Sequence, residues 1–388
     1  MRGLRIIDAA PGETGALMLQ EALHQRLFSD GPAVSAVPEP SRHVTATYAA
    51  AARAAVAADP GGVPGDVAVV VATSGSTGRP RGVLLTESNV KSAAQRADLA
   101  RPGLATCAWI LALPVTSVAG LNVVARSLLA DSPLAVLPSV GGSTTFDPAD
   151  LLALEVTEPF AVSLVPSQLR LVVENVDATR LLSAAHTVLV GGAATDQTLL
   201  DRARAAGIPA VSTYGMTETT GGCVFDGIPL PDVRVSTDDT GRISVNGPTI
   251  AAGYLRPGPD DGFAADGGFT TGDVGRWDGQ RLVVFGRADD IVTVHGVNVS
   301  LGAIEHLLLR GEDVREAAVV AVSDPASGSR LIAYVVLNGD TSTSPVDLAD
   351  AAREQLGGAA RPEVVRVDEL PHLPNGKIDR LALRNAGA

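Results

Sequence analysis

Lysine, cysteine and aromatic residues are all scarce in this chain of 388 residues. Of its 30 basic residues only Lys91 and Lys377 are lysines, so a lysine that is retained here needs a reason. The two cysteines are too few for a disulfide framework or a structural zinc site, and they fit a reducing cytoplasm. Aromatic residues make up 3% of the chain, which argues against a stacking platform for single-stranded nucleic acid.

An excess of positive charge and a long apolar run are also missing. The net charge of −13, without a basic stripe, argues against a nucleic-acid-binding protein, and an anionic ligand must be held by local groups. No run approaches the roughly 18 apolar residues of a membrane span, and Asp8 and Glu13 interrupt the region of a signal peptide. The sequence predicts a soluble, acidic, cytoplasmic protein without a nucleic-acid or membrane partner.

Short apolar runs alternate with helical stretches in the first half of the chain. Residues 1–65 are rich in alanine and are expected to be mostly helical. Beyond them, helical segments such as 86–96 separate short apolar runs that are expected to be buried strands: 67–72, 109–113, 161–165, 187–190 and 210–213. This alternation predicts an α/β core with substantial parallel sheet.

The texture of the sequence changes near residue 230, where short strands with Gly/Asp turns begin. These features predict a β-rich subdomain over about 230–286, with strands at 241–245 and 281–285. The chain after Gly286 contains two further apolar strands and one amphipathic helix. The strands are expected at 317–322 and 331–337, and the apolar side of the helix carries Leu348, Ala352 and Leu356. We therefore predict a large N-terminal domain of α/β layers, 1–286, and a small mobile α+β C-terminal domain, 287–388.

A glycine-rich loop follows the strand predicted at 67–72. Its sequence is Thr73-Ser74-Gly75-Ser76-Thr77-Gly78-Arg79-Pro80-Arg81-Gly82. Glycines let backbone N–H groups approach an oxyanion closely, and the hydroxyls add donors. The loop lacks the GK[ST] ending of a Walker loop, and taken alone it could equally be a mobile surface turn.

Four further motifs follow this loop in a fixed order: Tyr214-Gly215-Met216-Thr217-Glu218-Thr219, Thr271-Gly272-Asp273, Gly286-Arg287-Ala288-Asp289-Asp290, and Pro374-Asn375-Gly376-Lys377. Together the five motifs resemble those of the adenylate-forming superfamily of acyl-CoA ligases, luciferases and adenylation domains. The resemblance covers nearly all of residues 67–380. Within the superfamily, residues 163–169, 189–194 and 213–224 look like the compact o-succinylbenzoate–CoA ligases of menaquinone synthesis, of the actinobacterial type.

The resemblance implies two half-reactions. The carboxylate of a small acid attacks the α-phosphorus of ATP, which gives an acyl-adenylate and pyrophosphate. The thiol of coenzyme A then displaces AMP to form a thioester. Because two anions meet in the first step, charge neutralisation and positioning dominate catalysis. The implied cofactors are ATP, Mg²⁺ and coenzyme A as co-substrate, and a homodimer is implied as well.

The resemblance also assigns roles to residues of this chain. The phosphate-binding loop would comprise Thr73, Ser74, Gly75, Ser76, Thr77 and Gly78, with Arg81 where the family has lysine. Thr217 would donate to the α-phosphate, and Glu218 would bind Mg²⁺, a hard cation suited to carboxylate and phosphate oxygens. The adenine would lie against Tyr214, Gly215, Gly191, Gly192 and Ala193. Asp273 and Arg287 would bind the ribose, and Asp289 is at the position of the family's interdomain hinge.

Lys377 would bridge the substrate carboxylate and the α-phosphate during adenylation, which a compact ammonium on a flexible stem can do. The resemblance implies that the C-terminal domain then swings, withdraws Lys377 and admits coenzyme A past residues 294–297. This role accounts for a lysine in a chain that uses arginine almost everywhere.

The acyl pocket would be lined by five residues: Ser163, Ser167, Arg170, Gly221 and Gly222. Arg170 could bind the distal carboxylate of a dicarboxylic acid, or it could simply face solvent. The segment around Ser117 lacks the histidine or aromatic residue that usually gates this pocket in the family.

Three functions remain open at this point. The first is an o-succinylbenzoate–CoA ligase. The second is an aryl-acid ligase, or an adenylation domain that loads a carrier protein. The third is a catalytically silent nucleotide-binding regulator, although a binding module has no need of the bridging Lys377.

Overall fold

The computed structural model describes residues 1–41, 44–58, 61–73, 80–141, 145–156, 159–259, 261–311, 313–324, 328–339, 341, 343–371 and 378–387. The fold is of the mixed α/β class and forms two compact units. The first unit comprises Met1–Ser236, Ser244–Thr270 and Asp278–Leu282, and the second comprises Thr237–Ile243, Thr271–Trp277 and Val283–Ala388. Among the described residues, no helix has the length and apolarity that a membrane crossing requires.

The first sheet of the first unit has the strand order β1-β2-β3-β4-β14. Its strands are β1 (Leu4–Ala9), β2 (Ala33–Pro38), β3 (Val67–Ala72), β4 (Gly82–Thr86) and β14 (Gly253–Tyr254). β1, β2 and β3 run parallel, whereas β4 is antiparallel to β3 and to β14. The strand expected at 67–72 is confirmed as β3.

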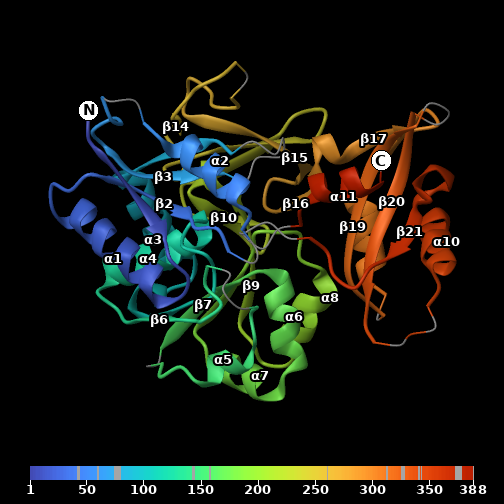
Figure 1. Cartoon of the computed structure of the whole chain (residues 1–388), viewed down its shortest axis with the longest axis horizontal. Coiled ribbons are helices and arrows are strands. Elements are labelled where there is room, and N and C mark those ends of the chain that lie inside the picture. Colours follow the sequence, from blue (N-terminus) through green and yellow to red (C-terminus); the bar gives the residue numbers. More distant parts are fainter. Residues whose placement is uncertain are drawn as a thin grey trace. The chain divides into compact units, whose positions relative to one another are not determined.

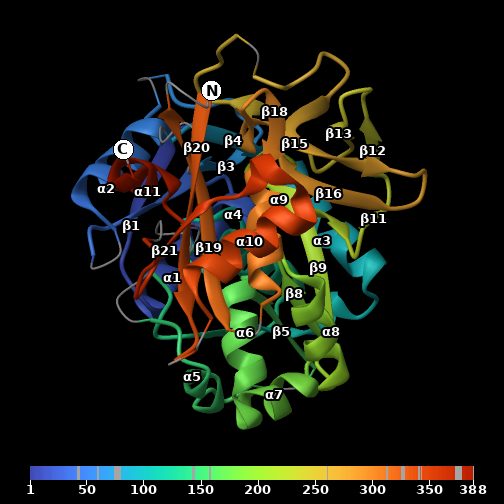
Figure 2. The same cartoon turned by 90° about the vertical axis from the view of Figure 1, so that its right-hand side faces the viewer.

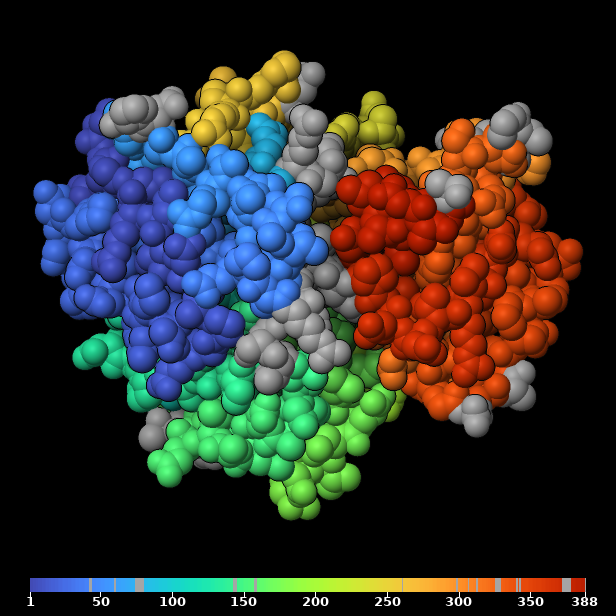
Figure 3. Space-filling model, in the orientation of Figure 1, coloured from blue at the N-terminus to red at the C-terminus, as the bar shows by residue number. Residues whose placement is uncertain are grey.

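The expectation that residues 1–65 are mostly helical is wrong. Two helices, α1 (Glu13–Phe28) and α2 (Ala46–Val56), alternate there with β1 and β2. The prediction gave weight to the alanine-rich composition and overlooked two short apolar runs. β2 is buried along almost its whole length, because neighbouring strands and helices cover it. The outer sides of α1 and α2 belong to the blue region of the surface in Figure 3.

The second sheet has the strand order β11-β10-β9-β8-β7-β5-β6. Its strands are β5 (Ala108–Leu111), β6 (Leu134–Val136), β7 (Phe160–Leu164), β8 (Thr187–Val190), β9 (Ala210–Met216), β10 (Gly221–Phe225) and β11 (Ile228–Pro229). The five strands from β6 to β9 in this order are parallel, and β10 and β11 add antiparallel pairs at one edge. The predicted parallel sheet is therefore confirmed.

Helices α3 (Glu87–Ala100) and α4 (Val118–Ala130) lie between the two sheets (Figure 1). α3 packs on β3, β4 and β10, while α4 packs on β5, β7 and α1. α3 begins with a capping box in which Thr86 and Asn89 bond each other's backbone N–H groups. The remaining helices of the unit are α5 (Ala149–Leu152), α6 (Pro166–Glu174), α7 (Val176–Ser183) and α8 (Gln197–Ala205), with the 3₁₀ turn η1 (Leu104–Thr106). α8 packs on β9 and against α6 (Figure 2).

A four-stranded sheet has the order β12-β13-β15-β16. Its strands are β12 (Arg234–Thr237), β13 (Arg242–Asn246), β15 (Gly268–Trp277) and β16 (Leu282–Arg287). The strands expected at 241–245 and 281–285 are confirmed as β13 and β16, each within two residues.

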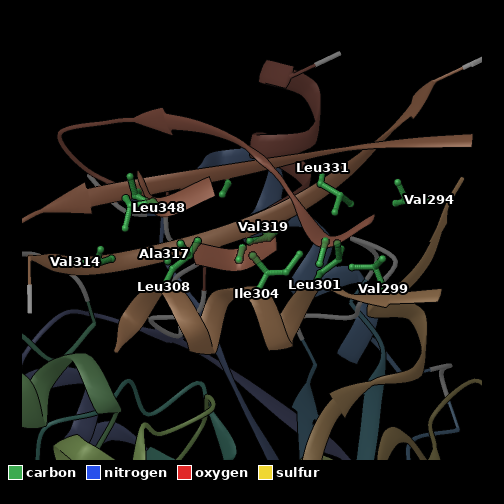
Figure 4. Close-up of a cluster of buried hydrophobic side chains, with 14 of the residues drawn as sticks. Val294, Val299, Leu301, Ile304, Leu308, Val314, Ala317, Val319, Leu331 and Leu348 are labelled. Atoms are coloured by element: carbon green, nitrogen blue, oxygen red, sulfur yellow. The ribbon is translucent and has the colours of Figure 1, made fainter. Parts of the chain in front are cut away.

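The second unit contains a three-stranded sheet with a helix-covered core. The sheet has the order β19-β20-β21, with β19 (Val314–Asp324), β20 (Gly328–Leu337) and β21 (Glu363–Arg366). Side chains of α9 (Leu301–Leu309) and α10 (Pro345–Leu356), among them Ile304 and Leu348, pack on one side of it (Figure 4). Leu370, and Leu383 of α11 (Arg380–Gly387), pack on the other side of the sheet.

Two details of this unit depend on local sequence. Leu348 and Ala352 are buried as predicted, but Leu356 is 40% exposed because α10 ends there, before Gly357 and the 3₁₀ turn η4 (Gly358–Ala360). The hairpin of β17 (Ile291–Val294) and β18 (Val297–Ser300) turns at His295 and Gly296. Their φ angles of 49° and 79° are those of a turn that follows the right-handed twist of paired strands.

Among the residues described in the first unit, Arg26 and Arg126 are buried in contrasting surroundings. Arg26 is 4% exposed, and its guanidinium donates to the Val67 carbonyl at 3.0 Å and to Glu87 at 3.0 Å. Arg126 is 8% exposed and lies over the Trp109 ring at 5.3 Å. Its Nε has no hydrogen-bond partner among the described residues, and burial lowers the pKa of Arg126 to about 10. A buried charge that lacks a carboxylate partner destabilises the folded state. Removal of one member of a buried, hydrogen-bonded ion pair also destabilises it, because the other member is left without its partner.

We therefore expect opposite effects from removing the two guanidinium groups. Arg26→Met should lower the free energy of unfolding by about 2 kcal/mol, because the Val67 carbonyl loses its guanidinium donor and Glu87 loses one of its two cationic partners, Arg26 and Lys91. Arg126→Met should raise it by about 1 kcal/mol, because an apolar chain of similar length replaces an unpaired buried charge. Urea unfolding of the two variants measures both effects, and equal destabilisation would contradict this assignment.

Burial also keeps the thiol of Cys223 in β10 protonated. Desolvation raises the pKa of Cys223 from 9.0 to about 12, although a hydrogen bond with Thr219 opposes the shift. From about pH 9 to about pH 12 the unfolded chain loses this proton while the folded chain keeps it, so stability falls as pH rises. The expected loss is about 1.4 kcal/mol per pH unit, and Cys223→Ala should lack it. Urea unfolding of both proteins at about pH 8 and about pH 10 tests this; parallel losses would refute it.

Candidate active site

Several of the predicted binding residues gather where three neighbouring parallel strands end. Ser163 is the penultimate residue of β7, residues 191–193 follow β8 directly, and Tyr214 lies near the end of β9. Leu164 pairs with Val190, which in turn pairs with Ser212, so these strand ends lie side by side. The carboxyl edge of a parallel sheet is the usual ligand-binding edge of α/β proteins.

Glycines at this edge allow close approach of backbones. A Cβ atom on Gly191 would lie 2.2 Å from Thr213 Oγ1, and one on Gly215 would lie 2.0 Å from the Gly221 carbonyl oxygen. Across the β9–β10 pair, Gly215 is opposite Gly222. The structure thus brings together glycines that the sequence assigned to the adenine and acyl sites. Gly191 and Gly215 are required for packing, because a side chain at either position would clash with a neighbouring strand.

Thr217 and Glu218 lie in a 3₁₀ turn, η2 (Thr217–Thr219), directly after β9. Thr219 is buried, and its hydroxyl donates to the Gly221 carbonyl at 2.7 Å. The next residue, Thr220, has a φ of 53°, which is strained for a β-branched side chain. Its carbonyl accepts from Asn122 Nδ2 at 2.8 Å, and the Glu218 carbonyl accepts from the Ala251 N–H at 2.9 Å. These bonds fix the backbone that presents Thr217 and Glu218.

The glycine-rich loop is described at its two ends. Ser74, Gly75, Ser76, Thr77 and Gly78 lie outside the described residues. Thr73 N–H donates to the Arg81 carbonyl at 2.8 Å, and Arg81 N–H donates to Thr73 Oγ1 at 3.3 Å. Ala72 and Gly82 pair across β3 and β4, so the loop starts and ends at the same place in the first sheet.

Arg81 and Glu218 are linked through a tyrosine. The Arg81 guanidinium lies 3.3 Å from the centroid of the Tyr254 ring and forms an ion pair with Asp261. The Tyr254 hydroxyl donates to Glu218 Oε1 at 2.7 Å. Burial, together with the charge of Glu218, raises the pKa of Tyr254 well above its ordinary value, so this hydroxyl stays a donor. Neither Tyr254 nor Asp261 was predicted from the sequence; the one available signal was the rarity of tyrosine, which occurs four times.

Glu218 has the chemistry expected of a Mg²⁺ ligand. Mg²⁺ is commonly bound by one or two carboxylates together with substrate phosphates. No cluster of three or more His, Cys, Asp or Glu side chains suited to a metal occurs among the residues that the structure describes. The Glu218 carboxylate, with one oxygen hydrogen-bonded by Tyr254, has the chemistry of a ligand for a cation shared with ATP.

In the second unit, Arg287 joins two predicted site residues. Its Nε and Nη2 atoms donate to the two Asp289 oxygens at 2.7 and 3.2 Å, and Nη1 lies 3.7 Å from Asp273 Oδ1. Asp289 lies in η3 (Ala288–Asp290). Although burial opposes its charge, the hydrogen bond with Arg287 lowers the pKa of Asp289. A Cβ on Gly272 would lie 2.6 Å from Arg287 Nη2, so this glycine leaves room for the guanidinium.

The predicted acyl-site residues are divided between β7 and α6. Ser163 is 7% exposed at the end of β7, while Ser167 is exposed and Arg170 half-buried on α6. Ser167 and Arg170 are three residues apart on the helix and share a face. Lys377 lies outside the described residues.

Comparison with known proteins identifies the family. The pattern of the AMP-binding enzyme family matches residues 20–255, and that of the AMP-binding enzyme C-terminal domain matches residues 303–377. The chain is 37% identical to a protein of Mycobacterium tuberculosis named "Probable 2-succinylbenzoate–CoA ligase", over 98% of this chain and 97% of that protein. It is 30% identical to the 2-succinylbenzoate–CoA ligase of Listeria innocua, over 82% of this chain and 69% of that one.

A solved structure gives the same result. The O-succinylbenzoate coenzyme A synthetase of Bacillus subtilis, in complex with ATP and a magnesium ion, superposes with a TM-score of 0.69. The two sequences are 27% identical, and the match covers 82% of this chain and 69% of that one. The predicted superfamily and fold class are thereby confirmed: the chain belongs to the AMP-binding enzyme family.

Proposed function

We propose that this protein is an AMP-forming acid–thiol ligase that converts 2-succinylbenzoate, ATP and coenzyme A to 2-succinylbenzoyl-CoA, AMP and pyrophosphate. The 37% identity to the M. tuberculosis protein, which extends over almost all of both chains, carries this proposal. The fixed turn of Thr217 and Glu218 at the carboxyl edge, linked to the end of the glycine-rich loop, supports adenylate chemistry.

We carry over the residue roles in the first half-reaction from the resemblance to the family. Thr217 would donate to the α-phosphate, and Tyr214, Gly215 and residues 191–193 would surround the adenine. Glu218 would hold Mg²⁺, which when bound neutralises phosphate charge. Residues 73–78 and Arg81 would bind the outer phosphates, and the carboxylate of Asp273 and the guanidinium of Arg287 would bind the ribose.

The acyl site would lie at the same sheet edge. Ser163, Gly221 and Gly222 would contact the aromatic acid, and Ser167 and Arg170 would face its distal carboxylate. A half-buried arginine suits this task because its planar fork matches a carboxylate.

We further propose a functional division of the chain into an adenylation domain, 1–286, and a mobile domain, 287–388, with the hinge at Asp289. Lys377 would bridge the two reacting anions in the first half-reaction and leave before coenzyme A reacts. The acidic composition and the two buried free cysteines support a cytoplasmic location, and the resemblance supports a homodimer.

The first prediction from this proposal concerns the products. The full chain with Mg-ATP and 2-succinylbenzoate should release pyrophosphate, and addition of coenzyme A should yield a thioester with the mass of 2-succinylbenzoyl-CoA. Release only with other aryl acids would keep the chemistry and change the substrate. Acylation of a carrier protein in place of coenzyme A would change the acceptor, and ATP binding without release for any acid would favour a regulator.

The second prediction concerns Lys377. Lys377→Ala should slow adenylate formation about 10²–10³-fold, because one preorganised charge is lost where two anions meet. Thioester formation from supplied acyl-adenylate should remain largely intact. Lys91→Ala is the matched control, since the other lysine of the chain forms an ion pair with Glu87 one helical turn away in α3, outside the proposed site. Equal loss of both half-reactions in the Lys377 variant would contradict the bridging role.

A further inference from the structure

Tyr254 contacts two groups that the proposed function assigns to the nucleotide site. Its hydroxyl donates to Glu218 Oε1 at 2.7 Å, and one face of its ring is covered by the Arg81 guanidinium. The tyrosine therefore fixes one oxygen of the Glu218 carboxylate.

The Tyr254 ring is itself held on several sides. Phe263 packs edge-on against it with ring centroids 5.3 Å apart, and Phe269 packs behind Phe263 at 4.7 Å. The backbone of β14 pairs with β4, with Tyr254 opposite Val83, and Leu255 N–H donates to the Gly82 carbonyl at 2.7 Å. The segment that carries Tyr254 is thus fixed to the strand that begins where the glycine-rich loop ends.

Arg81 is fixed by the same segment. Asp261 forms an ion pair with it and is held in turn by the Gly258 N–H, which donates to Asp261 Oδ2 at 2.7 Å. A planar guanidinium can lie flat on the ring and pair with a carboxylate at its edge, and a lysine ammonium has no such plane. This geometry accounts for arginine at a position where the family pattern has lysine.

We propose that Tyr254 is a positioning residue that sets the Glu218 carboxylate and the Arg81 guanidinium relative to each other before the nucleotide binds. The hydroxyl and the ring of Tyr254 have separate roles. The hydroxyl orients the metal ligand, and the ring orients the cation of the glycine-rich loop. The inference rests on the proposed function for the roles of Glu218 and Arg81, but it concerns binding of metal and nucleotide and not the identity of the acid.

Direct binding measurements on the full chain separate the two ends of the side chain. Mn²⁺ is the probe, and its binding to the ATP-saturated protein is followed by electron paramagnetic resonance, without acid or coenzyme A. Tyr254→Phe should weaken Mn²⁺ binding roughly tenfold, because a hydrogen bond to a charged group is lost. ATP binding in the presence of a chelator should be unchanged in this variant, because the ring under Arg81 remains.

Tyr254→Leu should show both losses. Mn²⁺ binding should weaken as in Tyr254→Phe, and the affinity for metal-free ATP should also fall by roughly threefold or more, because the aromatic face under Arg81 is gone. Tyr48→Phe is the matched control, since Tyr48 is a half-buried tyrosine on α2 outside this network, and it should bind both as the wild type does.

A double-mutant cycle guards against a general loss of folding. In a Glu218→Gln background, Tyr254→Phe should have little further effect on Mn²⁺ binding, because both changes act on one interaction. Unchanged Mn²⁺ affinity in Tyr254→Phe, additive effects in the cycle, or an equal loss of metal-free ATP binding in Tyr254→Phe would overturn the proposal. A wild type that binds Mn²⁺ and ATP but activates no acid would refute the proposed function and leave this inference standing.

Discussion

The register of the parallel strands β7, β8 and β9 is the constraint on which the first unit's site depends. Because each strand pairs with its neighbour in register, Ser163, the glycines after β8 and Tyr214 reach the same edge. The antiparallel strand β10 then returns so closely beside β9 that Gly215 has no space for a side chain. The turn that carries Thr217 and Glu218 lies between these two strands, and its position follows from their close approach.

Charge in this acidic protein is organised locally. Arg81 lies between a tyrosine ring and Asp261, Arg287 lies between Asp273 and Asp289, and Arg380 pairs with Glu305 and donates to the Val319 carbonyl in the second unit. In each case the planar guanidinium contacts two groups at once, which a lysine ammonium does less well. The strong preference of this chain for arginine is therefore consistent with its ion pairs.

Much of the fold was predictable because buried strands of parallel sheets are continuous apolar runs. β3 and β8 lie where those runs predicted them, and the other predicted strands differ by a few residues at their ends. The failure at residues 1–65 has the opposite cause. β1 precedes α1 and β2 lies between α1 and α2, and the strand character of both depends on pairing with each other and, for β2, with β3.

By itself the sequence determined the order of the five motifs, the superfamily that they indicate and the residue types of the proposed nucleotide site, because those side chains have few chemical substitutes. Only the tertiary structure decided which groups support them. Tyr254 and Asp261 follow Glu218 by dozens of positions and Arg81 by far more, and no periodicity relates them. Their contacts exist because β14 pairs with β4 and brings Tyr254 and Asp261 to the end of the glycine-rich loop, and strand pairing over such separations is a property of the folded chain.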